Sequence, residues 1–279
     1  MNLKFIVNDY ILIWNLLFRA SVSESIHNIK QKIWFNYKKE YNETLNDLPL
    51  ILKDPKNFIP KDDTIYNIVS ELDEYEIIKK DTERFRVELL KIWDQNKKKA
   101  QVELNSILKI DIKTYDVLVV YDKLNVIDTV DKEDLKKRFI ICGKKIDENI
   151  PYITIIEMIF KIIKKEFREY KTEYKDIVNA VLELAILNEF ASRMTGMSCY
   201  LSGDNSLKFL KKQIYPYFLM YLGIEEKDLE ERMKKDKMIF DVSRYSYERQ
   251  LRKLDLYEFI NFCIRNQKFI IKLDEIDII

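Results

Sequence analysis

Residues that interrupt helices are scarce in this chain, which has four glycines and five prolines among 279 residues. Three of the five prolines lie in one segment, Asn42–Lys61, so a helix has few reasons to end elsewhere. Lys, Glu, Leu and Ile are abundant and favour helices. The sequence therefore predicts an α+β fold that is predominantly α-helical, with long helices.

The first half of the chain has mainly helical patterns. Helices are expected over Asn2–Ala20, Ser23–Tyr41 and Thr64–Leu72, with an extended connection over the proline-containing segment Asn42–Lys61. Ser23 is a suitable N-cap for the second of these helices. Apolar residues then recur at steps of three and four from Ile78 to Ile107, which predicts a long amphipathic helix over Glu74–Leu108.

β-branched and aromatic residues become frequent after residue 110. Short strands are expected at Tyr115–Tyr121, Asn125–Thr129 and Phe139–Cys142. Helical patterns return over Thr154–Tyr170, Thr172–Thr195, Ser206–Leu222, Glu226–Lys235 and Tyr245–Asn266, and the tail Phe269–Ile279 is a candidate terminal strand. Pro216 is expected to kink the third of these helices, and Gly223 fits the position just after its end. We expect a helical N-terminal part over 1–110 and an α+β part over 111–279 with a helical C-terminal extension, both in one integrated core.

A single histidine, His27, restricts the chemistry open to this protein. Histidine is the commonest metal ligand and the usual acid or base at neutral pH. Zinc enzymes and Ser-His-Asp or Cys-His hydrolases are therefore hard to build here, and His27 itself is more readily explained as a surface or capped core residue. No nucleotide-binding glycine motif occurs. The sequence predicts no cofactor and no bound metal.

Charge and cysteine content limit the partners and the compartment. The 48 basic and 47 acidic residues leave a formal charge of +1, so no basic field favours nucleic acid. Cys142, Cys199 and Cys263 show no disulfide or zinc-ribbon spacing, which fits a reducing cytoplasm. The apolar segment Phe5–Phe18 contains Asn8 and Asp9 and is too short to span a bilayer, so we expect a buried amphipathic helix there and no membrane span.

Two apolar helices in the centre of the chain carry isolated carboxylates. Glu157 shares one narrow polar face of Thr154–Tyr170 with Lys161, a favourable order for a helical ion pair. Glu183 is the lone polar residue of the run Ala180–Leu187. A carboxylate in such a run needs a partner or a polar cavity. It is therefore either a structural ion pair or the remnant of a functional site.

The order of two strands, a loop and two buried helices resembles the catalytic core of gluzincin-type zincin metallopeptidases. In that family the first helix carries HExxH, with two zinc-binding histidines around a general-base glutamate. The segment TIIEMIFKII is similar to that helix, with Glu157 at the base position and Ile156 and Phe160 at the histidine positions. ELAILNEFASR is similar to the third-ligand helix, where Glu189 or Glu183 would match the ligand. The resemblance covers about Tyr115–Gly196.

The missing histidines change what this resemblance implies. Without the two imidazoles no three-ligand zinc site forms, and a water molecule keeps its high pKa. The resemblance implies a non-catalytic pseudo-peptidase that binds or regulates a protein or peptide partner. A metal-independent or Mg²⁺-dependent hydrolase that uses Glu157, Glu183 or Glu189 is the alternative, and a purely helical interaction or structural protein is a third possibility.

A cluster of small polar residues follows the second helix. Ser202, Asp204 and Asn205 lie in the segment SGDNS, directly before a predicted helix. Such residues form turns and N-caps, and they also occur in exposed recognition loops. Ser198 and Cys199 lie just upstream without a base partner in the sequence, so neither is expected to be a nucleophile.

Overall fold

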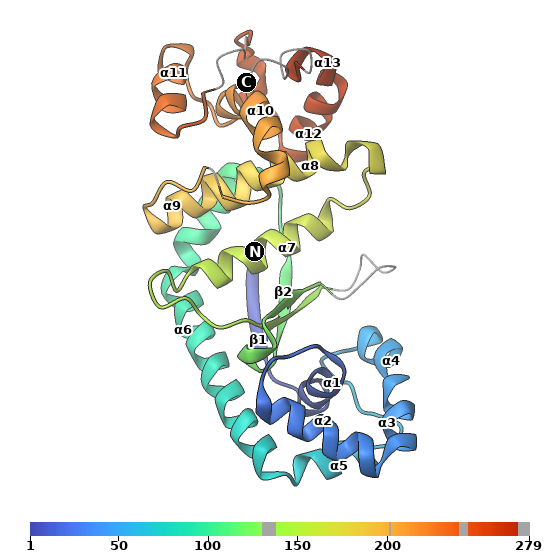
Figure 1. Ribbon diagram of the computed structural model, residues 1–279. Coiled ribbons are helices and arrows are strands. Elements are labelled where there is room, and N and C mark those ends of the chain that lie inside the picture. The colour runs from blue at the N-terminus through green and yellow to red at the C-terminus, as the bar shows by residue number, and fades with distance from the viewer. Residues whose placement is uncertain (130–137, 201, 240–244, 273–279) are drawn as a thin grey trace. The chain divides into compact units, whose positions relative to one another are not determined.

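The computed structural model describes residues 1–129, 138–200, 202–239 and 245–272. It is mostly helical with one small sheet, which confirms the predicted α+β class (Figure 1). Within the described part of the chain, no helix is both long enough and apolar enough to cross a membrane.

Contacts group the chain into two compact units. Unit 1 comprises Met1–Lys97 and Lys113–Lys161, and unit 2 comprises Lys98–Ile112 and Ile162–Ile279. The helices α6 (Asp73–Leu108) and α7 (Ile153–Glu166) contribute residues to both units. The units interleave along the chain because long helices are shared and the N-terminal segment joins a sheet formed later in the chain, and a domain boundary after residue 110 stays a prediction.

Unit 1 contains a four-stranded mixed sheet. Its strands are β1 (Asn2–Ile6), β2 (Thr114–Val119), β3 (Val126–Asp128) and β4 (Phe139–Gly143). They lie in the order β1-β2-β4-β3, with β1 and β4 parallel to β2 and with β3 antiparallel to β4. The three predicted strands are confirmed, and β1 is an additional strand.

The helix expected over Asn2–Ala20 is wrong in its first part. Asn2–Ile6 is a strand in which Leu3 and Phe5 are buried on one face, and Leu3 pairs with Tyr115 of β2. Helix α1 then covers Asp9–Phe18, and the Asn8 side chain caps it by accepting a hydrogen bond from the Ile11 N–H at 3.1 Å. The sequence did not reveal the boundary between strand and helix, because a two-residue period of apolar residues over so few positions resembles part of a buried helix.

The remaining N-terminal helices are shorter than expected. They are α2 (Glu24–Asn36), α3 (Lys38–Leu45), α4 (Leu48–Lys53) and α5 (Thr64–Ser70). The predicted helix over Ser23–Tyr41 is interrupted at Tyr37, whose φ of −137° is not helical, and the Ser23 side chain makes no capping hydrogen bond. The segment Asn42–Lys61 is partly helical rather than extended, because Pro49 lies in the first turn of α4, where a proline is tolerated.

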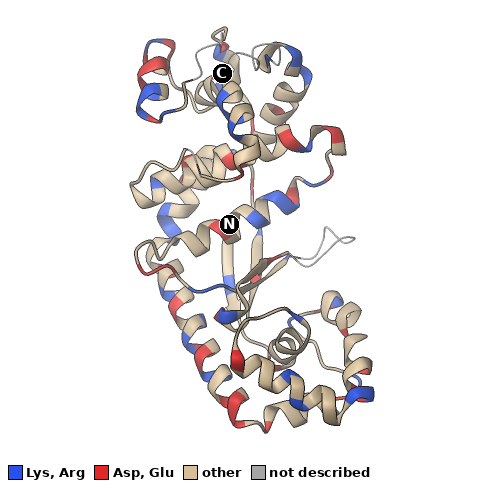
Figure 2. Cartoon of the chain, in the orientation of Figure 1, with Lys and Arg blue, Asp and Glu red and all other residues tan. Residues whose placement is uncertain are grey.

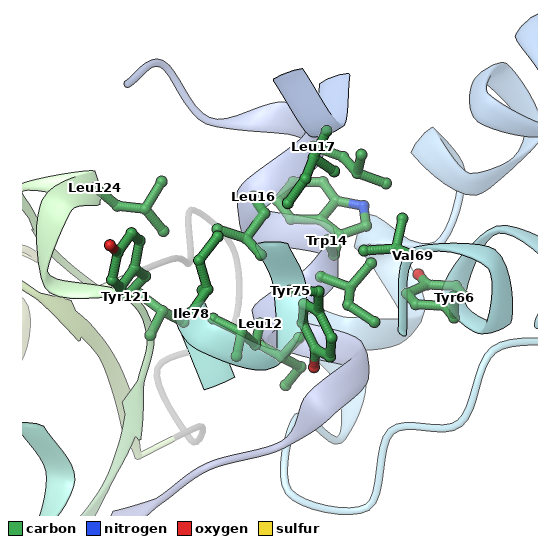
Figure 3. Close-up of a cluster of buried hydrophobic side chains, with 14 of the residues drawn as sticks. Leu12, Trp14, Leu16, Leu17, Tyr66, Val69, Tyr75, Ile78, Tyr121 and Leu124 are labelled. Atoms are coloured by element: carbon green, nitrogen blue, oxygen red, sulfur yellow. The ribbon is translucent and has the colours of Figure 1, made fainter. Parts of the chain in front are cut away.

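These helices and the sheet share one hydrophobic core in unit 1. Figure 3 shows its side chains gathered from α1, α5, α6 and the segment after β2. The labelled members are Leu12, Trp14, Leu16, Leu17, Tyr66, Val69, Tyr75, Ile78, Tyr121 and Leu124. The expectation that the first apolar helix is buried holds for α1, since Ile11–Leu17 is buried throughout. The long helix α6 confirms the prediction for Glu74–Leu108 to within one residue.

Unit 2 is helical in its described residues. It contains α8 (Lys175–Leu182), a π-helix (Glu183–Phe190), α9 (Ala191–Thr195), α10 (Lys208–Tyr221), α11 (Glu226–Lys235), α12 (Leu256–Arg265) and α13 (Gln267–Ile270). With a preceding 3₁₀ turn at Thr172–Tyr174, the first three form the helical run predicted over Thr172–Thr195.

The ends of the C-terminal helices follow recognisable capping rules. Gly223, at φ +88°, occupies the predicted position after α10, where its N–H donates to the Met220 carbonyl at 2.9 Å and the Ile224 N–H donates to the Leu219 carbonyl at 3.0 Å. The helix expected over Tyr245–Asn266 begins too early, because Asp255 forms a capping box with Glu258 and starts α12 there. Most of the candidate strand Phe269–Ile279 lies outside the described residues.

Candidate functional site: buried carboxylates of a π-helix

The π-helix in unit 2 places three polar side chains in the protein interior. Glu183, Asn188 and Glu189 are 4%, 0% and 2% exposed. π-helices are rare and occur preferentially at functional sites. The wider turn was not predicted, because apolar periodicity marks a helix without revealing its hydrogen-bond pattern.

Glu183 forms a buried ion pair with a lysine from α10. The Lys211 Nζ lies 2.8 Å from Glu183 Oε2 and also donates to the Ser202 carbonyl at 2.6 Å. The backbone N–H of Asp204 donates to the Glu183 oxygens at 3.0 and 3.2 Å. This geometry agrees with the structural ion pair that the sequence left open beside a remnant site, and Lys211 is the partner that the sequence did not identify.

A glycine allows the polar loop to approach this carboxylate. Gly203 has φ +107°, and a Cβ atom built there would lie 2.2 Å from Glu183 Oε2. Only a residue without a side chain fits between the loop backbone and the carboxylate. Asn188 also holds the loop, since its Nδ2 donates to the carbonyls of Cys199 at 2.5 Å and Ser202 at 3.1 Å.

The loop's side chains face solvent while its backbone is anchored. Ser202, Asp204 and Asn205 are exposed, and the Asp204 carboxylate accepts hydrogen bonds from the Ser206 N–H at 2.9 Å and hydroxyl at 2.8 Å. Asp204 therefore caps the following turn, as one of the two sequence-based interpretations expected. The recognition role of this loop stays a prediction.

Glu189 is held by two arginines. Its Oε1 accepts from Arg193 Nε at 2.6 Å, and its Oε2 accepts from Arg232 Nη2 at 3.0 Å. Arg193 also reaches Glu103 of α6 at 2.9 Å, and Arg232 reaches the Tyr200 hydroxyl at 2.7 Å. Both oxygens of this buried carboxylate are thus engaged by cations from two different helices, which leaves little capacity for another ligand.

The same network continues from Arg232 to a buried aspartate. Asp236 accepts hydrogen bonds from Arg232 Nε and, at 2.6 Å, from the Tyr215 hydroxyl. Burial and this hydrogen bond raise the pKa of the Tyr215 phenol. Tyr215 therefore stays protonated and donates. Arg232 on α11 and Asp236 at its C-cap are spaced i, i+4, a pairing that the sequence could have suggested.

The residues compared with the HExxH helix lie in unit 1. On α7, Ile156 is fully buried and Phe160 is half-buried. The predicted ion pair between Glu157 and Lys161 is wrong, because Glu157 pairs with a different lysine. Its oxygens accept from the Lys144 ammonium at 2.5 and 2.7 Å, at a half-exposed position. Lys144 directly follows β4, so this ion pair joins the helix to the sheet.

Two buried cysteines and the single histidine are further candidate reactive groups. Burial raises the pKa of the Cys142 thiol to about 12 and also raises the pKa of Cys263. Such thiols remain protonated near neutral pH. His27 is exposed on α2, and its Nε2 lies 2.8 Å from Gln31 Nε2, which fits a surface histidine.

Comparisons add no relative to these observations. No protein-family model, characterised protein or solved structure matches the chain. Among the described residues, no group of three or more His, Cys, Asp or Glu side chains is placed to hold a metal ion. The chemical interpretation therefore depends on the contacts of the individual side chains.

Proposed function

We propose that this protein is a non-catalytic binding or regulatory protein of the cytoplasm, with a pseudo-peptidase-like scaffold. The observation that carries the proposal is the closure of both π-helix carboxylates in buried ion pairs. Lys211 and two arginines occupy the oxygens of Glu183 and Glu189.

Carboxylate catalysis requires a different environment. A general base must have a free lone pair within reach of the proton that it removes, and a metal ligand must offer an oxygen to the ion. Glu189 is poorly placed for either role, since its side chain is 2% exposed and each oxygen accepts from an arginine that holds it as a structural ion pair. Glu157 is more accessible, but Lys144 contacts both of its oxygens. These contacts favour a structural role for the acids over a hydrolase.

Two further observations support the proposed scaffold and compartment. Ile156, at one position that a zinc-binding histidine would take, is a fully buried core residue on α7. The three cysteines are free thiols, which suits a reducing compartment. A binding protein needs only a stable frame and an accessible surface. The ion-pair networks around Glu183 and Glu189 contribute to such a frame.

Metal content tests the absence of zinc chemistry. The protein is purified, incubated with excess zinc, desalted and analysed for bound metal. We expect substoichiometric zinc that Glu157→Gln and Glu189→Gln leave unchanged. Stoichiometric zinc that either variant removes would contradict the proposal.

A restoration experiment tests whether the π-helix carboxylates are closed. Ile156→His with Phe160→His creates an i, i+4 histidine pair on α7. We expect zinc affinity in this double variant that Glu183→Gln and Glu189→Gln leave unchanged, because Lys211 and two arginines already engage these carboxylates. Zinc affinity that falls with either addition would show a carboxylate available as a ligand and would contradict the proposal. Circular dichroism checks that each variant is folded.

A further inference from the structure

A pocket with an acidic lining lies wholly within unit 1, between α3, α4 and the start of α5. Its volume is about 320 Å³. The acids that line it are Glu40 and Glu43 of α3, Asp47 just before α4, and Asp62 near the start of α5. Lys61 is the one basic residue among the described residues of the lining. The pocket therefore gathers negative charge from three segments of the chain.

This excess of negative charge is a local feature. Over the whole chain basic and acidic residues nearly balance, at 48 against 47, and Figure 2 shows both kinds interspersed along α6. At the pocket, the exposed Lys39 lies 3.9 Å from Glu43, and Lys61 interacts electrostatically with Asp47. Four acids against these two lysines still leave two negative charges.

Asp47 differs from the other buried acids of the described chain, because it has no ion pair. Glu183, Glu189 and Asp236 each have a lysine or arginine partner. Asp47 is 8% exposed, and its described hydrogen-bond donor is the Tyr66 hydroxyl, 2.9 Å from Oδ2. A neutral donor satisfies one oxygen without balancing the charge, and an unbalanced buried carboxylate is costly. A cation from outside the chain would supply that balance.

The second oxygen of Asp47 is open to the pocket. Oδ1 accepts no hydrogen bond from a described residue, although it remains in contact with solvent. Asp47 occupies the N-cap position of α4, but its side chain makes no capping hydrogen bond there. The half-buried Leu50 and the exposed Pro49 add apolar surface to the same lining. The pocket thus joins a free carboxylate oxygen to an apolar wall.

We propose that this pocket binds an organic cation, in which an ammonium or guanidinium group is attached to a short apolar chain. The cationic group meets Asp47 Oδ1 and the carboxylates of Glu40 and Glu43, and the chain packs on Leu50. At about 320 Å³ the pocket is at the small end of ligand sites, which suits a chain of a few carbons. This inference names a ligand class for the proposed binding function and rests on it.

The geometry favours an organic cation over a metal ion. In the described part of the chain, no three acidic side chains converge as metal ligands would, and Tyr66 already holds one oxygen of Asp47. An ammonium group has three N–H donors and a guanidinium group has five. Such a group can therefore reach separate carboxylates without drawing them together.

Calorimetry with simple probes tests the ligand class. Butylamine and butylguanidine carry both features, ammonium chloride carries only the charge, and butanol carries only the chain. We expect saturable binding of at least one of the first two, at least about tenfold tighter than either single-feature probe.

A second pair of probes distinguishes the source of the cation. The methylamides of Nα-acetyl-lysine and Nα-acetyl-arginine carry the same two head groups on a peptide backbone. Binding at least as tight as that of the corresponding free probe indicates a side chain of a peptide partner. Weaker binding indicates a free amine or guanidine.

Variants locate the binding at this pocket. Asp47→Asn keeps an oxygen that can accept from Tyr66 but removes the charge, and we expect it to weaken binding about tenfold or more. Lys61→Gln removes a competing positive charge and should tighten binding about twofold or more. Asp63→Asn is the matched control, because Asp63 is exposed, makes no capping hydrogen bond through its side chain and does not line the pocket. We expect it to change binding less than about twofold.

Four results would overturn the inference. They are no saturable binding of butylamine or butylguanidine, equal binding of butanol or ammonium, equal weakening by Asp47→Asn and Asp63→Asn, and weaker binding to Lys61→Gln. Tighter binding of Ca²⁺ or Mg²⁺ that Asp47→Asn abolishes would also contradict it, since the pocket would then be a metal site. Far-ultraviolet circular dichroism confirms that each variant is folded. Zinc content reports on the proposed function independently, so a negative result here leaves that proposal standing.

Discussion

The Lys211 ammonium lies 2.8 Å from the Glu183 carboxylate, and the two side chains are only 2% and 6% exposed. The two residues lie 28 positions apart in the sequence on different helices, and the backbone of the loop around Gly203 adds further hydrogen bonds to the pair. Breaking a buried ion pair leaves one charge without a partner, which costs much more than the pair contributes.

The first prediction follows from that asymmetry. Lys211→Met should lower the free energy of unfolding by about 3–5 kcal/mol, because the buried Glu183 carboxylate loses its cationic partner. Urea unfolding followed by circular dichroism measures the loss. Lys80→Met is the matched control, since Lys80 pairs with Glu76 on the exposed face of α6 and should change stability little.

A second substitution separates charge from packing. Adding Glu183→Gln to Lys211→Met removes the unpaired charge while an amide oxygen can still accept from the Asp204 N–H. The double variant should therefore be more stable than Lys211→Met alone. If it is equally unstable or worse, lost packing rather than a buried charge explains the effect.

Gly203 should be far less replaceable than Gly196. Both have positive φ, so alanine is strained at either position by about 1–2 kcal/mol. A Cβ at Gly196 meets nothing within 4 Å, whereas at Gly203 it overlaps the Glu183 carboxylate, which Lys211 holds in place. Gly203→Ala should lower the melting temperature clearly more than Gly196→Ala. Equal shifts would mean that the loop moves aside without cost.

A buried aspartate in unit 1 should make stability depend on pH. Burial raises the pKa of Asp47 above its ordinary value, and the hydrogen bond from the Tyr66 hydroxyl at 2.9 Å partly offsets this. The folded state then binds a proton more readily than the unfolded state, so stability falls as the pH rises from the ordinary pKa to the raised pKa and stays lower above it.

Asp47→Asn should therefore stabilise the protein near neutral pH, and the gain should vanish below the ordinary pKa, where both states are protonated. Unfolding free energies measured from about pH 3 to pH 7 test this difference. Tyr66→Phe is the complementary variant, since losing the donor should raise the pKa of Asp47 further and increase the cost of ionisation. A pH-independent difference between Asp47→Asn and the parent would contradict this assignment.

The three thiols should react at different rates. Cys142 and Cys263 are buried with raised pKa values, and Cys199 is half-buried in the segment after α9. With Ellman's reagent the native protein should show one accessible thiol, which Cys199→Ser removes, and all three in denaturant. Rapid reaction of a second thiol would show that a core opens easily.

Local sequence rules correctly predicted those helices and strands whose own residues carry a clear pattern. The helix at Glu226–Lys235 and the long helix α6 follow directly from periodicity and charge placement. The strand Asn2–Ile6 escaped because its partner, β2, lies more than a hundred residues later and no local pattern records that pairing. The predicted α+β class was nevertheless correct, since the other three strands had clear β-branched runs.

In the candidate site, too, the sequence revealed local relationships between residues but not those between distant parts of the chain. Sequence identified Glu183 as unusual, because a carboxylate within an apolar helix requires compensation, and it named Glu189 through the resemblance to a third-ligand helix. It could suggest Arg193 for Glu189 from their i, i+4 spacing, but not Arg232, which lies 43 positions away. Lys211 was hidden for the same reason. The zincin-like role of these acids stays a proposal that the metal and restoration experiments address.

The parallel pairing of β1 with β2 has a consequence for how the chain is made. The first strand leaves the ribosome long before its partner at Thr114–Val119 has been synthesised, and β4 follows later still. Helix α1 must likewise wait for Tyr121 and Leu124 to complete its hydrophobic surroundings. The N-terminal segment is therefore exposed through much of translation, a period in which its apolar residues are open to chaperones and to misassociation.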